Sequence, residues 1–333
     1  MEYRQLGNSD LKVSSVIFGA WAVGGWMWGG SEESASIEAI HAAIDGGVSS
    51  IDTAAVYGYG RSEEIVGKAV KGKRDKVQLL TKYGLRWDST EGQHFFDWED
   101  EEDGLKKIYR NARKASIIKE CENSLRRLQT DYIDLYQCHW RDPSTPLEET
   151  MEAMTQLIKE GKIKAAGVSN FTREEIKEAN KLCPIASDQP PYSMVLRDIE
   201  KDVLPYCREN NIGVIVYSPL QRGLLTGKFK PDVKFKDGDH RAKQPQFTPE
   251  NIKRTNEFLD KIMPIAENHK ATLGQLVIAW TIAQPGVTAA LVGARDAEQT
   301  RENIKAQDIK LSADEMAEIH KHLDHLSLTP AGR

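Results

Sequence analysis

Short apolar segments alternate with segments of helical periodicity along this chain, and that alternation constrains the fold more than any other feature. The apolar segments lie at 14–21, 49–54, 76–84, 131–140, 163–171, 185–193, 213–220 and 287–294. Continuous apolar runs of this length are typical of parallel strands covered by helices. Eight βα units in about 300 residues predict a closed (β/α)₈ barrel, the TIM barrel, with an open doubly wound sheet as the alternative.

The open-sheet alternative makes a different prediction for the first turn from strand to helix. Doubly wound sheets usually carry a glycine fingerprint, G-x-G-x-x-G, in that turn. The segment FGAWAVGGWMW (18–28) is not that fingerprint. The later segment GYGRSE (58–63) begins like one, but Glu63 stands where the last glycine belongs. We therefore favour the barrel and interpret 58–63 as a tight glycine turn into the next helix, with Ser62 as its N-cap.

Three further segments add to the predicted barrel. Residues 3–14 have two short strand-like pieces around the polar turn GNSD, which predicts a hairpin that covers the N-terminal mouth. Residues 312–326 predict an extra helix at the C-terminal end. Residues 86–115 form a long insert after strand three, a candidate lid whose acidic run 97–103 we interpret as solvated surface. The whole chain, 1–333, is expected to be one domain.

The composition argues against several classes of function. The net charge of −5 offers no basic footprint for nucleic acid. No apolar run reaches the roughly 18 residues needed to span a bilayer, and the first residues lack a signal peptide, so we expect a cytoplasmic protein. The cysteines are expected to be reduced thiols, and they are Cys121, Cys138, Cys183 and Cys207. No Cys/His spacing predicts a metal site. We expect a small-molecule partner and a monomer or weak homo-oligomer.

Polar side chains stand where the predicted strands end, and in a parallel barrel these ends meet at one mouth. Asp52 and Tyr57 follow strand two, Lys82 follows strand three and His139 follows strand four. An ammonium beside a phenol lowers the pKa of the phenol, and a carboxylate keeps that ammonium charged. An imidazole can hydrogen-bond the reacting oxygen or relay its proton. Together the four side chains predict a proton donor for a carbonyl that becomes an alcohol.

A proton donor for a carbonyl needs a hydride source, and the loops after strands seven and eight form the usual phosphate site of such barrels. These loops are 218–228 and 293–303. They contain glycines, the cations Lys228 and Arg295, and a helix N-terminus capped by Asp296. The sequence therefore predicts a dinucleotide whose phosphates bind at these loops.

The nicotinamide end of that dinucleotide has candidate contacts of its own. Tyr217 ends strand seven with a flat ring suited to stacking on nicotinamide. Asn170 and Gln189 offer amide groups for the carboxamide. Trp21 and Gly293 end strands one and eight at the same mouth, and we expect both to contact the cofactor.

Seven motifs occur in a fixed order along the chain: DTAAVYGYGRSEEIVG, LLTKYG, LQTDYIDLYQCHW, GKIKAAGVSNF, QPPYS, YSPLQRGLLTGK and VGARDAEQTREN. With them the chain resembles the aldo-keto reductase superfamily over nearly its whole length. It looks most like the bacterial branch that contains a general stress reductase and the inositol-operon reductase. The resemblance implies a barrel that reduces aldehyde or ketone carbonyls with NADPH.

The resemblance also implies roles for individual residues. Tyr57 is the acid, Asp52 and Lys82 are its tuning pair, and His139 is the orienting residue. The implied cofactor contacts are Ser169, Asn170 and Gln189 at the carboxamide, Tyr217 at the ring, Ser218, Leu220, Gly223 and Lys228 at the pyrophosphate, and Arg295, Gln299 and Asn303 at the adenosine end.

Two other classes of function stay open. Channel β subunits are similar to this chain, and they bind cofactor but act through a partner. A metal-dependent sugar isomerase or lyase would need Asp52, His139 and Asp188 as ligands, a thin set for that chemistry. Turnover of NADPH with a reactive aldehyde, with and without a chelator, separates the three classes. The residues leave the substrate open among aldehydes, ketoses, inositol derivatives and 2-oxoaldehydes.

Overall fold

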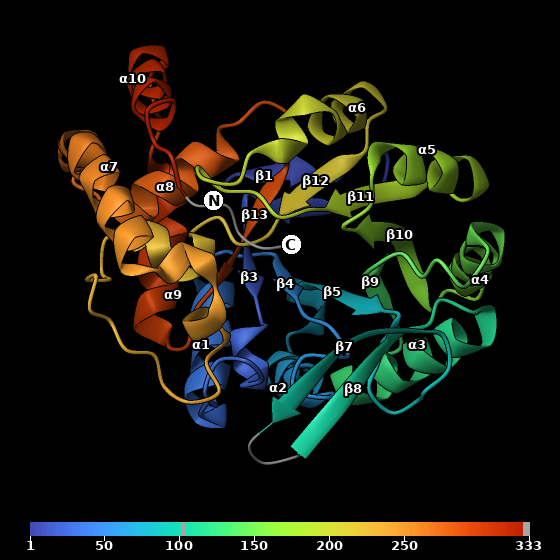
Figure 1. Ribbon diagram of the computed structural model, residues 1–333. Coiled ribbons are helices and arrows are strands. Elements are labelled where there is room, and N and C mark those ends of the chain that lie inside the picture. Colours follow the sequence, from blue (N-terminus) through green and yellow to red (C-terminus); the bar gives the residue numbers. More distant parts are fainter. Residues whose placement is uncertain (101–103, 329–333) are drawn as a thin grey trace.

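The computed structural model describes residues 1–100 and 104–328, and its centre is a closed barrel of eight parallel strands (Figure 1). The strands are β3 (Val16–Gly19), β4 (Ser50–Asp52), β5 (Gln78–Tyr83), β9 (Ile133–Cys138), β10 (Ile163–Ser169), β11 (Ile185–Gln189), β12 (Gly213–Val216) and β13 (Ala289–Gly293). They stand around the barrel in chain order, and β13 pairs with β3 to close it. The predicted (β/α)₈ barrel is confirmed, and the open sheet is wrong.

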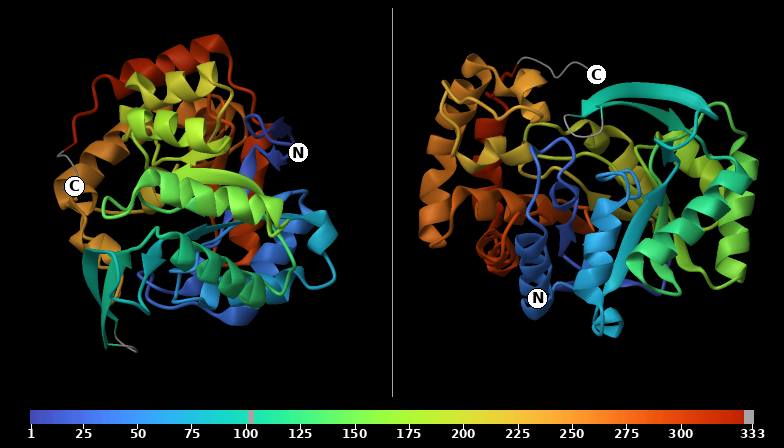
Figure 2. Two further views of the ribbon diagram at one scale, coloured as in Figure 1. Left: turned by 90° about the vertical axis from the view of Figure 1, so that its right-hand side faces the viewer. Right: turned by 90° about the horizontal axis from the view of Figure 1, so that it is seen from below.

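Helices surround the barrel on the outside (Figure 2). They are α1 (Glu33–Asp45), α2 (Arg61–Val70), α3 (Lys114–Leu128), α4 (Leu147–Lys159), α5 (Arg173–Leu182), α6 (Val203–Glu209), α7 (Pro249–Asn268), α8 (Leu273–Ile282), α9 (Ala297–Ile304) and α10 (Ala313–Leu323). Helices α7 and α10 pack together as the extra layer beyond the eight units. Thr172, Thr272 and Ser312 begin α5, α8 and α10 with reciprocal capping boxes, which explains where these helices start.

Short 3₁₀ helices fill several connections, at Ala22–Gly24, Arg74–Lys76, Asp198–Lys201, Gln221–Thr226, His240–Lys243, Pro245–Phe247 and Lys305–Asp308. Within residues 1–100 and 104–328, no helix is both long and apolar enough to cross a membrane. The four cysteines are buried and their thiols are free.

An antiparallel hairpin closes the N-terminal end of the barrel, as predicted. Its strands are β1 (Tyr3–Gln5) and β2 (Lys12–Ser14). Leu6, Leu11 and Val13 are buried in one cluster with side chains of the barrel interior. At the turn of the hairpin, Gly7 has φ +53°, and a Cβ there would lie 2.4 Å from the carbonyl oxygen of Ala186. Only glycine fits this contact.

We expect Gly7→Ala to lower the free energy of unfolding by about 2–5 kcal/mol, because a left-handed backbone and an overpacked contact both add cost. Gly72 is a matched control, since it has φ +73° but no atom within 4 Å of the Cβ position. Gly72→Ala should lower the free energy of unfolding only by the cost of a left-handed backbone, about 1–2 kcal/mol. Urea unfolding of both variants measures the difference, and equal losses would show that the hairpin turn has room for a methyl group.

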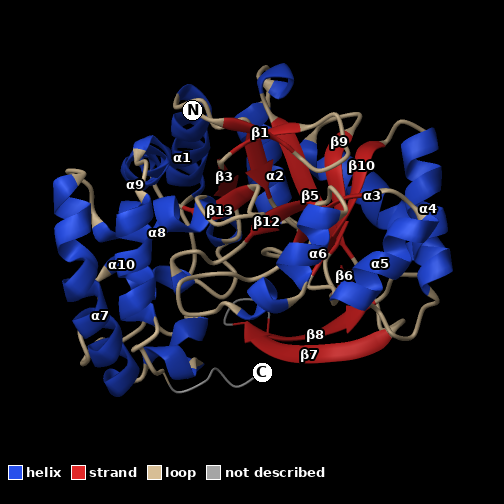
Figure 3. Ribbon diagram, turned by 90° about the horizontal axis from the view of Figure 1, so that it is seen from above, coloured by secondary structure: helices blue, strands red, loops and turns tan. Residues whose placement is uncertain are grey.

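The insert after strand three forms a second hairpin at the opposite end of the barrel (Figure 3). Strand β7 (Gln93–Asp100) pairs with one edge of β8 (Gly104–Arg110), and β6 (Leu85–Arg86) pairs with the other edge of β8, at Tyr109 and Arg110. A register shift between His94 and Phe96 breaks the alternation along β7, so the sequence showed no strand pattern there. Part of the acidic run, 101–103, lies outside the described residues.

Candidate active site

Lys82 is the centre of a polar cluster inside the mouth of the barrel. Its side chain is 1% exposed. Its Nζ donates hydrogen bonds to Asp52 Oδ1 at 2.5 Å, to the carbonyl oxygen of Thr53 at 2.9 Å and to Tyr57 Oη at 3.5 Å. Burial lowers the pKa of Lys82, while the carboxylates of Asp52 and Glu63 act in the opposite direction. The structure thus brings three of the four predicted catalytic side chains into contact.

The fourth predicted residue, His139, lies beside the phenol. Its ring centroid is 5.7 Å from that of Tyr57, and the two rings meet edge to face at 83°. Burial lowers the pKa of His139 well below its ordinary value, and the ammonium of Lys82 lowers it further. The imidazole is therefore neutral at neutral pH. A neutral imidazole can still donate a hydrogen bond to a reacting oxygen from its N–H group.

The pKa of Tyr57 differs from the expectation. Burial raises this pKa well above its ordinary value, and the carboxylate of Asp52 raises it further. The predicted net lowering is therefore wrong, because burial and the carboxylate of Asp52 outweigh the ammonium of Lys82, whose Nζ lies 3.5 Å from the phenol oxygen and 2.5 Å from Asp52. Tyr57 is therefore a protonated phenol throughout the ordinary pH range.

Glycines determine how Tyr57 is presented. Gly58 has φ +61° and Gly60 has φ +105°, so the chain turns sharply between Tyr57 and α2. A Cβ on Gly58 would lie 2.4 Å from the carbonyl oxygen of Gly24, and one on Gly24 would lie 2.8 Å from the backbone of Tyr57. The loops after β3 and β4 therefore touch backbone to backbone, which fixes the turn that carries Tyr57.

The predicted N-cap in this turn is wrong. Helix α2 begins at Arg61, and its N-cap position is Gly60, without a side-chain hydrogen bond. The hydroxyl of Ser62 is buried and lies 2.8 Å from both the carbonyl oxygen of Ala20 and Thr53 Oγ1. Ser62 therefore ties α2 to the strand ends instead of capping the helix.

Two glutamines hold the second oxygen of Asp52. Gln189 Nε2 donates to Asp52 Oδ2 at 2.8 Å, and Gln137 Nε2 donates to the same oxygen at 3.2 Å. The two amides also bond to each other at 3.1 Å. The sequence analysis missed Gln137, although a glutamine within the apolar strand β9 is a signal for a buried polar contact. The Nε2 group of Gln189 is bonded to Asp52 and Gln137, and the predicted contact of Gln189 with the carboxamide stays a prediction.

The other predicted nicotinamide contacts form one network. Asn170 Nδ2 donates to the carbonyl oxygen of His139 and to Ser169 Oγ, each at 3.0 Å. Tyr217 Oη donates to Asn170 Oδ1 at 2.7 Å. Ser169 Oγ donates to the carbonyl oxygen of Gln189 at 2.7 Å. These side chains are brought together next to the polar cluster, with Tyr217 at the end of β12.

The loop after β12, predicted to bind the pyrophosphate, contains several left-handed residues. Ser218 has φ +59° and Gly223 has φ +93°, and the backbone N–H of Gly223 bonds back to Leu220 at 2.9 Å. Between them, the Nε atom of Arg222 is buried without a hydrogen-bond partner in residues 1–100 and 104–328. Burial lowers the pKa of Arg222. Sequence analysis did not single out Arg222, whose buried and unpaired Nε makes this residue a candidate contact for an anion.

The predicted adenosine residues gather after β13. Asp296 caps α9 by accepting from the backbone N–H of Gln299 at 2.8 Å, as predicted. Gln299 also accepts from the backbone N–H of Arg295 at 3.2 Å, and Asn303 Nδ2 donates to the carbonyl oxygen of Gly293 at 3.2 Å. Arg295 donates to the carbonyl oxygen of Trp28 at 3.0 Å.

Lys228, predicted at the pyrophosphate, is exposed in the loop after β12, and its contact with a phosphate stays a prediction. Burial lowers the pKa of Arg295, and the nearby positive charge of Arg241 lowers it further. Arg241 lies between Asp239 and the ring of Trp28. It comes from the long irregular loop after β12, where no periodicity marked it.

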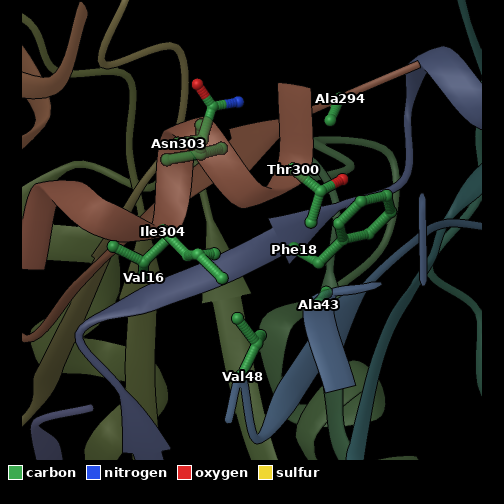
Figure 4. A pocket seen from close by; sticks show the side chains of 9 residues that line it. Val16, Phe18, Ala43, Val48, Ala294, Thr300, Asn303 and Ile304 are labelled. Carbon is green, nitrogen blue, oxygen red and sulfur yellow. The ribbon is translucent and has the colours of Figure 1, made fainter. Parts of the chain in front are cut away.

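A narrow crevice lies between the outer side of strands β3 and β13 and helices α1 and α9 (Figure 4). It is lined by Val16, Phe18, Ala43, Val48, Val292, Ala294, Thr300, Asn303 and Ile304. Thr300 and Asn303 both donate hydrogen bonds to backbone carbonyls. The crevice contains neither Tyr57 nor Lys82, so we interpret it as part of helix packing.

The described residues contain no group of three or more His, Cys, Asp or Glu side chains that could hold a metal ion. Asp52 is occupied by Lys82 and two glutamines. Asp188 is buried, and burial raises its pKa well above its ordinary value, which disfavours the charged form that would bind a metal.

Comparison with known proteins gives consistent results. A family model described as "Aldo/keto reductase family" matches residues 15–324. "Aldo-keto reductase YhdN" from Bacillus subtilis (strain 168) is 40% identical over 338 residues, covering 100% of this chain and 96% of that protein. "NADH-specific methylglyoxal reductase" from Escherichia coli (strain K12) is 37% identical over 313 residues, which cover 92% of this chain and 94% of that protein. The solved structure of the glycerol dehydrogenase AKR11B4 from Gluconobacter oxydans has a TM-score of 0.87 and 39% identity, covering 98% and 96%.

Proposed function

Because the chain belongs to the aldo/keto reductase family, we propose that it reduces aldehyde or ketone carbonyls to alcohols with NADPH, and that Tyr57 donates the proton. The observation that carries this proposal is the position of Lys82 Nζ, which bonds Asp52 and Tyr57 at once inside the mouth. A phenol in contact with a buried ammonium is suited to give up its proton to a developing alkoxide, since the ammonium stabilises the phenolate left behind.

The residues at the mouth fit a nicotinamide cofactor. Arg222 has a buried Nε without a partner among residues 1–100 and 104–328, beside a loop whose left-handed residues bring its backbone close to a ligand. Tyr217, Asn170 and Ser169 would hold the nicotinamide, and Arg295 the far end. When bound, such a cofactor supplies the hydride for the carbonyl carbon.

The chain's own residues perform the rest of the reaction. Tyr57 transfers its proton to the carbonyl oxygen, so that the product is the neutral alcohol. Lys82 stabilises the resulting phenolate, and Asp52, held by Gln137 and Gln189, keeps Lys82 charged and in place. His139, which is neutral, hydrogen-bonds the substrate oxygen and orients it toward Tyr57.

The direct test is oxidation of NADPH, followed at 340 nm, with a reactive aldehyde in the presence and absence of a chelator. Turnover that the chelator does not change supports the proposal. Binding of NADPH without turnover of any aldehyde would instead favour a regulatory subunit.

Arg295 is expected to set the choice of cofactor. NADPH differs from NADH by a 2′-phosphate, and a charge-assisted hydrogen bond to it contributes roughly 1.5–3 kcal/mol, or about 10- to 150-fold in affinity. The neighbouring Arg241 is already paired with Asp239, so Arg295 is the cation that would meet the phosphate. We therefore propose a preference for NADPH, although one relative is named NADH-specific. Arg295→Ala should lose about 10-fold or more in NADPH affinity and much less in NADH affinity.

Dissociation constants for both cofactors, from quenching of tryptophan fluorescence, measure this effect. Arg301→Ala is the matched control, because Arg301 is exposed on α9, the helix that follows Arg295. Equal affinities of the unaltered enzyme for NADPH and NADH, or equal losses in Arg295→Ala, would show that Arg295 does not read the phosphate.

A further inference from the structure

Glu63 is a buried carboxylate on the outer side of the barrel wall, behind Lys82. It lies in the first turn of α2, and its side chain is fully buried. Its Oε1 accepts a hydrogen bond from Thr81 Oγ1 at 2.6 Å. Thr81 precedes Lys82 in β5, and successive side chains of a strand point to opposite faces. Glu63 therefore bonds the outer face of the strand whose inner face carries Lys82.

Arg127 of α3 is the counter-ion of this carboxylate. Its Nε donates a hydrogen bond to Glu63 Oε2 at 2.6 Å. The same side chain packs on the turn that carries Tyr57, since a Cβ on Gly60 would lie 2.8 Å from Arg127 Cδ. A buried ion pair often stabilises a fold no more than well-packed apolar residues do, so stability alone does not account for this pair.

The first turn of α2 touches Lys82 by a second route, through Ser62. Ser62 Oγ lies 2.8 Å from Thr53 Oγ1, and the carbonyl oxygen of Thr53 accepts a hydrogen bond from Lys82 Nζ at 2.9 Å. The helix thus holds both segments that place the ammonium, and it begins directly after the turn that carries Tyr57. The distance of 3.5 Å between Lys82 Nζ and Tyr57 Oη therefore depends on how this turn of α2 sits on β4 and β5.

The charge of Glu63 acts on Lys82 as well. Burial lowers the pKa of Lys82, and the carboxylates of Asp52 and Glu63 raise it. Away from water a charge is weakly screened, so its effect crosses the strand. The titratable groups that face Glu63 are Arg127 and Cys121 of α3, Tyr136 of β9 and Lys82, and those that face Lys82 and Tyr57 in the mouth are Asp52, His139 and Tyr217. Burial raises the pKa of Cys121 to about 12 and that of Tyr136 well above its ordinary value, so both are neutral.

We propose that Glu63 is a positioning residue for the reaction at Tyr57: its bond to Thr81 fixes β5 against the turn that carries Tyr57, and its carboxylate, with Arg127 as counter-ion, keeps Lys82 charged. The inference rests on the proposed carbonyl reduction. The contact and the charge have different consequences. Loss of the contact misplaces Lys82 and lowers kcat, whereas loss of the charge also changes the pH at which the proton donor fails.

Glu63→Gln tests the charge, because the amide oxygen can still accept from Thr81. A nearby negative charge raises the pKa of an ammonium and of a phenol alike, and both Lys82 and Tyr57 are active in their protonated forms. Its loss should therefore move the basic limb of kcat to lower pH, by roughly one pH unit. Glu64→Gln is the matched control, since Glu64 is the next residue and is exposed, and it should leave the limb in place. The measurement is kcat against pH, with NADPH and a reactive aldehyde both saturating.

Thr81→Val tests the contact, because it removes the hydroxyl that bonds Glu63 and keeps the shape of the side chain and the charge of Glu63. It should lower kcat roughly 3- to 10-fold, the equivalent of one hydrogen bond, and leave the basic limb where it is. The KM for the aldehyde and the affinity for NADPH should barely change. Thr81→Ser keeps the hydroxyl and should retain most of kcat.

The double variant Glu63→Gln with Arg127→Gln separates this role from folding, and it carries the same test if Glu63→Gln alone does not fold. Two amides can bond each other, so the double variant should be more stable than Glu63→Gln in urea unfolding and keep the shifted limb. A limb that stays in place in Glu63→Gln, or that returns together with stability in the double variant, overturns the inference. An unaltered enzyme that does not oxidise NADPH with any aldehyde contradicts the proposed function as well, which distinguishes the two failures.

Discussion

Tyr57→Phe is expected to lower kcat for carbonyl reduction by at least about 100-fold, the low end of the effect of a general acid. The change removes one oxygen, which accepts from Lys82 at 3.5 Å, and keeps the ring that packs against Trp21 and His139. Because the fold and the phosphate contacts are untouched, NADPH affinity should barely change. Steady-state oxidation of NADPH and fluorescence quenching measure the two quantities separately.

Tyr59→Phe is the matched control. Tyr59 lies in the same turn, but its ring packs on Trp26 and Trp87 and not on the polar cluster. This variant should stay within a few-fold of the unaltered enzyme. If Tyr57→Phe also stays within a few-fold, Tyr57 does not donate the proton, and the proposed reaction needs another acid.

The arrangement at Tyr57 shows how far sequence alone reaches. Asp52, Lys82 and His139 could be predicted because the βα alternation places each at the end of a strand, and a closed barrel brings these ends together. Gln137 was missed because its contact with Asp52 crosses β5, which stands between β4 and β9. A contact across an intervening strand depends on how the barrel closes, and no short motif records that.

Two corrections have the same physical origin. The pKa of Tyr57 depends on burial and on the distance of 2.5 Å between Lys82 and Asp52, and neither quantity is visible in a list of residue types. Ser62 stands where an N-cap is common, but the approach of the loop after β3 provides it with the carbonyl oxygen of Ala20 instead.

Lys82→Met is expected to reduce kcat on the order of 100-fold, because an opposite charge near an acid shifts its pKa by about one to three units. Nζ is the hydrogen-bond donor to Tyr57 Oη, and its removal leaves the carboxylate of Asp52 without its ammonium beside the phenol. Since the protonated phenol is the active form in reduction, a pKa raised further moves the basic limb of the residual rate upward in pH.

Folding has to be separated from catalysis in this experiment, since breaking a buried ion pair costs about 3–5 kcal/mol of stability. The double variant Asp52→Asn with Lys82→Met removes both charges and leaves an amide that still accepts from Gln137 and Gln189. We expect the double variant to regain most of the lost stability in urea unfolding but not the lost kcat. If kcat returns together with stability, Lys82 acts only by holding the barrel mouth together. If the single variant keeps full activity and an unchanged pH profile, the ammonium has no part in the proton transfer from Tyr57.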